Sequence, residues 1–227
     1  MGKQAMEITR ISRASWFKIR SGSNVVHFDP GYAGYFKNQG IPLDEINGFA
    51  DVILISHFHK DHLQPEMLEK IANENTQIVA PISCTKRIKN KMTVIKPGDL
   101  LTVNQIQINV VDAYNTIEGH STRKVHHKGD FVGYIVDLDD KRIYFAGDTD
   151  YIMEMRNLGR IDVAFLPVGG TFVMDIEEAL RAALTINPRI VFSMHESDKD
   201  PQVFKKKLAL KSNLEVIALN VGEKVII

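Results

Sequence analysis

The stretch Ser56-His57-Phe58-His59-Lys60-Asp61-His62 directly follows an apolar run at residues 52–55. Imidazole nitrogens and carboxylate oxygens are standard ligands for zinc and similar divalent ions. His57 and His59 are two residues apart, so in an extended segment their side chains point the same way and can bind one ion. Asp61 and His62 follow at a turn, where they can be presented to a second ion. The stretch therefore predicts a metal centre at the end of a buried strand.

Four ligands from one loop cannot complete two metal sites, so the remaining ligands should follow other strands. Asp148 follows the predicted strand at residues 142–146, after the conformationally permissive Gly147. Its carboxylate could bridge two cations and lower their mutual repulsion. His195 follows a further apolar run at residues 190–194. Both residues are candidates to complete the centre.

Short β-branched runs recur along the chain and predict strands, several of them covered on both faces. These runs are residues 24–28, 51–55, 106–111, 131–136, 142–145, 163–166, 190–192 and 216–219. Helices are expected after Pro65, after the capping pair Asp175 and Glu178, and after Asp200-Pro201. The mixture predicts sheets covered by helices in one layered domain that spans residues 1–227. The longest irregular stretch, about residues 115–130, is too long for an idle connection.

Composition excludes several classes of protein. Lys+Arg and Asp+Glu both number 28, so no global field attracts nucleic acid, and none is expected as a partner. No run reaches transmembrane length, and the N-terminus lacks the apolar segment of a signal peptide. The single cysteine, Cys84, cannot form an intrachain disulfide and is expected to be a small buried hydrophobe. We expect a cytoplasmic protein that acts on a small molecule; its oligomeric state stays open.

Three motifs occur in a fixed order along the chain and resemble the metallo-β-lactamase superfamily. They are His57-Phe58-His59-Lys60-Asp61-His62, Gly147-Asp148-Thr149 and Met194-His195. The branch most similar contains L-ascorbate-6-phosphate lactonase and the N-acyl-phosphatidylethanolamine phospholipase D enzymes. Further matching pieces are Asp29-Pro30, Asp112-Ala113-Tyr114-Asn115, His126-His127-Lys128-Gly129 and Leu166-Pro167-Val168-Gly169-Gly170. The resemblance spans about residues 8–196 and implies an α/β fold, a four-layer αββα sandwich with two mixed sheets.

The same resemblance implies a ligand set for two metal ions. His57, His59 and a third histidine would hold the first ion, and Asp61, His62 and His195 the second, with Asp148 as the bridge. His126 is favoured as the third histidine, because Lys128-Gly129 and Gly133-Tyr134 follow it at the spacing of the branch. The alternative is His120, because a related group of the superfamily has this ligand in a His-Ser pair, which His120-Ser121 resembles.

The activity implied is hydrolysis of an ester, lactone or phosphodiester by hydroxide formed on two divalent metal ions. Asp61 would also act in catalysis, by orienting the nucleophile and passing protons. Zinc is the first expectation for both ions, and manganese or iron accept the same ligands. No GxSxG elbow is present to support a serine nucleophile.

Three alternatives belong to other functional classes. Some superfamily members are nucleases, although this neutral chain shows no basic track. Some relatives perform redox chemistry at iron, but they typically carry a changed ligand motif and a flavin module. The third alternative is a non-catalytic protein that keeps the fold and binds metal for structure.

Two segments could border the substrate. The irregular stretch carries Arg123, Lys124 and Lys128, which could contact a phosphate or carboxylate or simply be solvated. Residues 31–36 mix glycine with aromatics and could form a flap or an ordinary packed loop. His27, inside an apolar strand, is expected to be structural, although its nearness to Asp29-Pro30 leaves open a role in orienting the metal ligands.

Overall fold

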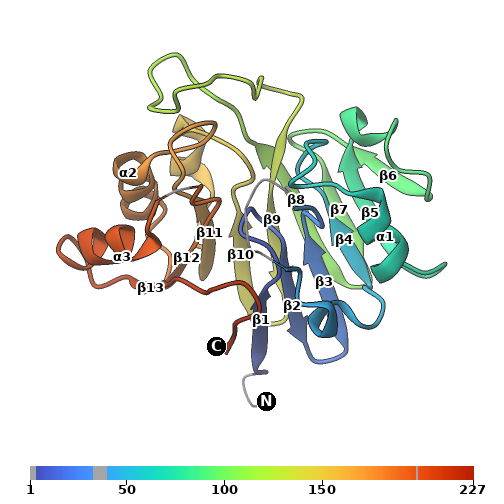
Figure 1. The fold of residues 1–227 in the computed structure, drawn as a ribbon. Helices are drawn as coiled ribbons and strands as arrows, with labels where there is room; N and C mark the ends of the chain where they lie inside the picture. Colours follow the sequence, from blue (N-terminus) through green and yellow to red (C-terminus); the bar gives the residue numbers. More distant parts are fainter. Residues whose placement is uncertain (1–3, 33–39, 198) are drawn as a thin grey trace. The chain divides into compact units, whose positions relative to one another are not determined.

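The computed structural model describes residues 4–32, 40–197 and 199–227 (Figure 1). The described chain forms two seven-stranded mixed sheets and three α-helices. Close contacts divide it into two compact units. Unit 1 comprises Met1–Ile95, Thr102–Ile106 and Leu219–Ile227, and unit 2 comprises Lys96–Leu101 and Gln107–Ala218. The prediction that residues 1–227 form a single domain stays a prediction.

The first sheet has the strand order β14-β1-β2-β3-β4-β5-β6. Its strands are β1 (Met6–Arg10), β2 (Phe17–Ser21), β3 (Asn24–Phe28), β4 (Val52–Leu54), β5 (Gln77–Pro81), β6 (Met92–Ile95) and β14 (Lys224–Ile226). Strands β14, β1, β2 and β3 pair antiparallel, whereas β3 to β6 pair parallel. The segments after β3 and β4 therefore leave the sheet at the same edge.

Helix α1 (Pro65–Ile71) covers part of this sheet. It begins at a proline in its first turn and buries Met67, Leu68 and Ile71. These side chains join a core cluster with Ile53 of β4 and Ile78 of β5. The 3-10 helices η1 (Leu43–Ile46) and η2 (Ile82–Cys84) also lie in unit 1. The buried face of α1 thus anchors the segment that follows β4.

The second sheet has the order β13-β12-β11-β10-β9-β8-β7. Its strands are β7 (Leu100–Val103), β8 (Ile106–Asp112), β9 (Val132–Leu138), β10 (Lys141–Phe145), β11 (Val163–Pro167), β12 (Ile190–Met194) and β13 (Glu215–Ile217). Strands β8, β9 and β10 pair antiparallel, and β10 to β13 pair parallel. The carboxyl ends of β10, β11 and β12 therefore share one edge.

Two helices accompany the parallel strands of this sheet. Helix α2 (Ile176–Ile186) packs on β11, and α3 (Pro201–Ala209) packs on α2 and β13 (Figure 1). Asp175 caps α2 by accepting a hydrogen bond from the Glu178 N–H, as the sequence predicts. The 3-10 helix η3 (Met153–Asn157) follows β10. None of the described helices is long and apolar enough to cross a membrane.

The structure confirms all eight runs predicted to be strands and all three predicted helices. It adds β1, β2, β5, β6, β7 and β14, which the sequence pattern did not single out. Residues 115–130 contain no helix or strand, also as predicted. Cys84 is a free, fully buried thiol, and burial raises its pKa to about 12. It is therefore unreactive at neutral pH.

Candidate metal centre

The predicted ligand stretch leaves the end of β4 and turns back within unit 1. His57 and His62 are fully buried, and His59 is partly buried. The His57 Nε2 and His59 Nδ1 atoms lie 3.0 Å apart, and the His57 and His62 rings have centroids 3.9 Å apart. The Asp61 carboxylate lies 3.7 Å from His62 Nε2. The four residues predicted from the motif therefore form one cluster.

Asp29, which follows β3, orients two of these histidines. Its buried carboxylate accepts hydrogen bonds from the Ser56 N–H (2.6 Å), the Ser56 hydroxyl (2.6 Å) and the His62 Nδ1–H (2.7 Å). Because the Ser56 hydroxyl donates to Asp29, its oxygen accepts from His57 Nδ1 at 2.9 Å. In both rings the proton is thus fixed on Nδ1, so Nε2 carries the lone pair that a metal ion would take.

Burial raises the pKa of Asp29, and the hydrogen bonds from His62 and Ser56 act in the opposite direction. Its backbone adopts a left-handed conformation, with φ of 46°. Gly31 explains how the loop after Asp29 reaches the ligand stretch. A Cβ on Gly31 would lie 2.6 Å from the backbone atoms of His62, so only glycine permits this approach.

Unit 2 holds a second cluster at the shared ends of β10 and β12. Asp148 follows β10 after Gly147, which has a φ of +64°. The Asp148 Oδ2 atom lies 3.3 Å from His126 Nε2 and 3.4 Å from His195 Nε2. All three side chains are at most 4% exposed. The structure thus brings together the three remaining residues of the predicted ligand set.

The His126 ring is oriented from the opposite side by two oxygen atoms. Its Nδ1 lies 3.0 Å from the Phe172 carbonyl oxygen and 3.1 Å from Asn115 Oδ1. Asn115 Oδ1 also accepts from the backbone N–H groups of Val125 and His126, at 3.0 and 2.9 Å. With Nδ1–H held by an oxygen, Nε2 again directs its lone pair at a carboxylate. The arrangement repeats in unit 2 what Asp29 does in unit 1.

The structure separates the two candidates for the third histidine. His126 is 1% exposed and lies beside Asp148. His120 is exposed, and its Nδ1 lies 2.9 Å from Asp175 Oδ2 at the start of α2. Within unit 2, only the position of His126 fits a shared site with Asp148 and His195. His120 takes part in a different cluster.

The cations of the irregular stretch differ in their partners. Lys124 Nζ lies 2.9 Å from the buried Asp150 carboxylate, and Lys128 Nζ lies 2.6 Å from Glu154. Arg123 instead stacks over the Phe172 ring, with its Cζ 5.6 Å from the ring centroid. Arg123 thus contacts the residue whose carbonyl orients His126. Of the segment expected to form a flap, residues 31–36, positions 33–36 lie outside the described residues.

The sequence pattern indicated Asp29 and Asn115 only as parts of matching motifs, and it gave no role to Ser56 or Asp150. Asp150 is fully buried and holds the irregular stretch by accepting from the Thr116 N–H at 2.9 Å and from Lys124. Asp150 directly follows the Gly147-Asp148-Thr149 motif, and this position could have indicated that it lies near the site. The Phe172 carbonyl had no such signal, since any residue supplies a carbonyl.

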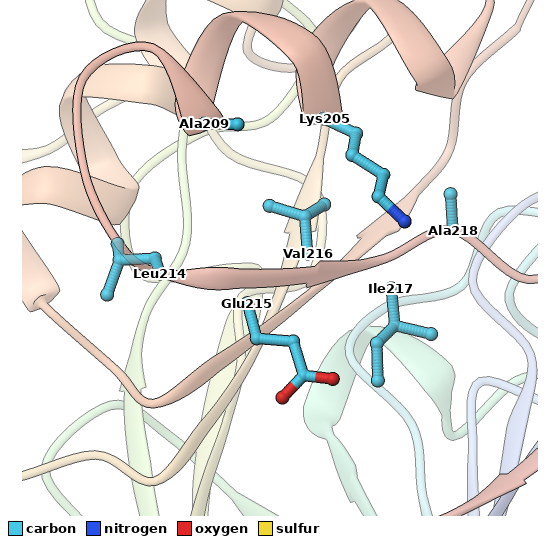
Figure 2. Close-up of a pocket in the computed structure, with 7 residues that line it drawn as sticks. All are labelled: Lys205, Ala209, Leu214, Glu215, Val216, Ile217 and Ala218. Carbon is cyan, nitrogen blue, oxygen red and sulfur yellow. The ribbon is translucent and has the colours of Figure 1, made fainter.

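Two other features lie outside these clusters. His27 accepts a hydrogen bond from Trp16 Nε1 at 2.9 Å, and burial lowers its pKa to about 3, which fits the structural role expected for it. An open hollow of about 380 Å³ lies where α3 meets β13; Figure 2 shows the residues that line it. Lys205 and Glu215 are its charged lining residues, and no histidine borders it. It offers no metal-ligand set.

The β-lactamase superfamily domain matches residues 7–195 of the chain. The chain is 30% identical to a UPF0173 metal-dependent hydrolase of Archaeoglobus fulgidus over 240 aligned positions, which cover 96% of this chain and 97% of the relative. It is 33% identical to another of Thermococcus kodakarensis, covering 89% and 92% of the two chains. The chain belongs to the metallo-β-lactamase superfamily. Within that superfamily it is a metal-dependent hydrolase.

Two solved structures are similar to this chain over nearly its whole length. A Parabacteroides distasonis protein described as a metal-dependent hydrolase superposes with a TM-score of 0.81 at 33% identity, covering 95% of this chain and 93% of that one. A metallo hydrolase of Ignicoccus hospitalis shares the fold, with a TM-score of 0.76 at 23% identity and 98% coverage of both chains. The fold class predicted from the sequence is confirmed. The lactonase and phospholipase D-like branch stays a prediction.

Proposed function

We propose that the chain hydrolyses an ester, lactone or phosphodiester bond of a small anionic substrate, using two divalent metal ions. One observation carries the proposal. Both units contain buried histidines whose Nδ1–H is held by an oxygen and whose Nε2 lies near a carboxylate. Such second partners fix the tautomer that binds metal, and they are characteristic of metal-ligating histidines.

The ligand set of the proposed centre follows the superfamily pattern. His57, His59 and His126 would hold one ion, and Asp61, His62 and His195 the other, with Asp148 as the bridge. The donors present fit this use, because neutral imidazoles and carboxylates suit zinc, manganese and iron, and no thiolate takes part. Zinc is the first expectation.

When bound, the two ions would acidify a water molecule and polarise the bond to be cleaved. In the superfamily pattern Asp61 would orient that water and accept its proton; its side chain is 13% exposed and thus accessible, whereas its neighbour His62 is fully enclosed. Asp29 and the Phe172 carbonyl would keep the ligands in one tautomer, so that no reorganisation is needed during the reaction. Asp61 is therefore the proposed catalytic residue.

The charge of the substrate is inferred from Arg123. Its two cationic neighbours, Lys124 and Lys128, are engaged by Asp150 and Glu154, whereas Arg123 is exposed and rests on the Phe172 ring. Arginine is well suited to bind a carboxylate or phosphate in a bidentate manner. An Arg123→Gln variant should raise KM for an anionic ester and leave KM for a neutral ester unchanged. An equal effect on both esters would exclude this assignment.

The test of the proposed function combines metal content with turnover. The purified chain should contain at least two metal ions per chain and hydrolyse one member of a panel: a lactone, a phosphodiester, a phosphomonoester and a thioester. Chelation should abolish turnover, and so should Asp148→Ala.

The matched control is Asp137→Ala on β9, whose carboxylate pairs with Arg142 away from both clusters. It should keep the metal content and turnover of the unmodified chain. Metal-loaded protein that cleaves no member of the panel would contradict the proposed bond classes.

A further inference from the structure

A second group of metal-ligating side chains lies within unit 2, apart from the proposed centre. His120 lies in the irregular stretch, Asp175 caps α2, and Glu178 lies in the first turn of that helix. One potential ligand atom from each residue lies within 4.8 Å of the other two. Imidazole with two carboxylates is a donor set that divalent transition metals accept.

Glu178 provides a second, independent indication of a ligand. Its side chain is 1% exposed. Oε1 lies 3.3 Å from Arg181 Nη2, but the equally buried Oε2 accepts no hydrogen bond from the described residues. A buried carboxylate oxygen that accepts no hydrogen bond destabilises the fold, and more strongly when the group is charged. Burial raises the pKa of Glu178 and nearby Asp150 adds to the rise, while the His120 N–H and Arg181 oppose it.

The two other side chains are arranged to share an ion with Glu178. Asp175 Oδ1 accepts the capping hydrogen bond from the Glu178 N–H at 2.8 Å, which fixes the carboxylate and turns Oδ2 toward His120. The His120 side chain is 43% exposed, so a cation can enter from solvent on this side. Two carboxylates around one divalent ion would balance its charge.

We propose that His120, Asp175 and Glu178 bind one further divalent transition-metal ion, such as zinc, outside the catalytic centre. The ion would tie the irregular stretch to the first turn of α2. That stretch also carries His126, so occupancy would stabilise the segment that supplies a ligand to the proposed centre. Because the ion would bind the folded chain and not the unfolded one, the Tm would rise with the metal concentration.

The experiment is a zinc titration of the chelator-treated, full-length chain, with metal counted per chain and Tm recorded. His120→Ala and Glu178→Gln should each bind one zinc fewer than the unmodified chain and lose part of its zinc-dependent rise in Tm. Glu178→Gln is nearly isosteric, so it serves if His120→Ala fails to fold. The matched control is His127→Ala, an exposed histidine of the same stretch, which should bind as many ions as the unmodified chain.

The same comparison in a His57→Ala, His59→Ala background separates this proposal from the proposed function. If the site exists, His120→Ala also removes one zinc in this background, whatever number of ions the altered catalytic centre still binds. Equal zinc content and affinity with and without His120 would overturn the proposal. The His120–Asp175 contact would then be an ion pair that anchors the stretch to α2.

Discussion

The perturbation that examines the site most closely is Asp29→Asn, which keeps the shape of the side chain and removes its charge. In the structure, Asp29 Oδ2 accepts from both the Ser56 hydroxyl and the His62 Nδ1–H, at 2.6 and 2.7 Å. In the variant, Oδ1 can still accept from the Ser56 N–H, but an amide NH2 replaces Oδ2. The Ser56 hydroxyl and His62 Nδ1–H then both face another donor, and each can keep a hydrogen bond to the side chain only by becoming the acceptor.

For His62 this reversal is a change of tautomer. Nδ1 would then accept from the new amide and the proton would move to Nε2, the atom that faces Asp61 at 3.7 Å. A protonated Nε2 cannot bind a metal ion. Loss of such an outer partner typically lowers metal affinity about 10- to 100-fold, which corresponds to about 1.4–2.8 kcal/mol.

The assay is a zinc competition titration against a chromophoric chelator, together with nitrogen chemical shifts of the histidine rings. The expected result is weaker zinc binding, a His62 tautomer protonated at Nε2, and turnover that recovers partly at high zinc concentration. Asp51→Asn is the control, since Asp51 Oδ2 accepts a single hydrogen bond, from the Val25 N–H, and Asn can still accept it. Unchanged affinity in Asp29→Asn, with His62 still protonated at Nδ1, would refute the reasoning.

Three further predictions rest on single contacts. Gly31→Ala should lower the free energy of unfolding by about 1–3 kcal/mol and weaken metal binding, because the new Cβ would overlap the His62 backbone. Chemical denaturation measures the loss of stability, and unchanged stability would contradict the contact. Asn115→Ala should weaken metal binding more than Asn109→Ala, because Asn115 Oδ1 contacts both the backbone N–H and the ring Nδ1 of His126. Equal effects of the two variants in a metal titration would argue against that role. His27 has a folded pKa of about 3 against 6.5 for the free side chain, so it binds a proton more readily when unfolded. Titration of His27 should therefore leave the free energy of unfolding unchanged above pH 6.5 and lower it by about 1.4 kcal/mol per pH unit between pH 6.5 and 3. His27→Asn should remove this part of the acid sensitivity in pH-dependent unfolding, and an unchanged slope would count against it.

The sequence predicted the fold class and the ligand candidates because local pattern encodes both. Buried parallel strands such as β4, β11 and β12 appear as continuous apolar runs, and His57 to His62 follow one of them without interruption. By contrast, β1 and β2 carry Arg10 and Lys18, charged residues that tertiary partners bury. Arg10 is satisfied by the Ser12 and Leu219 carbonyl oxygens, and the Leu219 contact spans 209 residues of sequence.

The orienting residues of the site were harder to predict for a related reason. Asp29 and His62 are 33 residues apart, and the Phe172 carbonyl reaches His126 across 46 residues. Nothing in their local sequence reports these pairings, since they arise only when parallel strands place their ends at one sheet edge. The choice of His126 over His120 likewise had no local physical signal, and the structure supports it by placing His126 beside Asp148.

The most direct test of the account is a crystal structure of the zinc-loaded chain with anomalous diffraction measured at the zinc edge. The account predicts one anomalous peak bound by His57, His59 and His126, a second bound by Asp61, His62 and His195, and Asp148 in contact with both. Apart from any peak at the separate His120 site, a single peak held by residues of one unit alone, or no peak at these seven side chains, would contradict the proposed dinuclear centre.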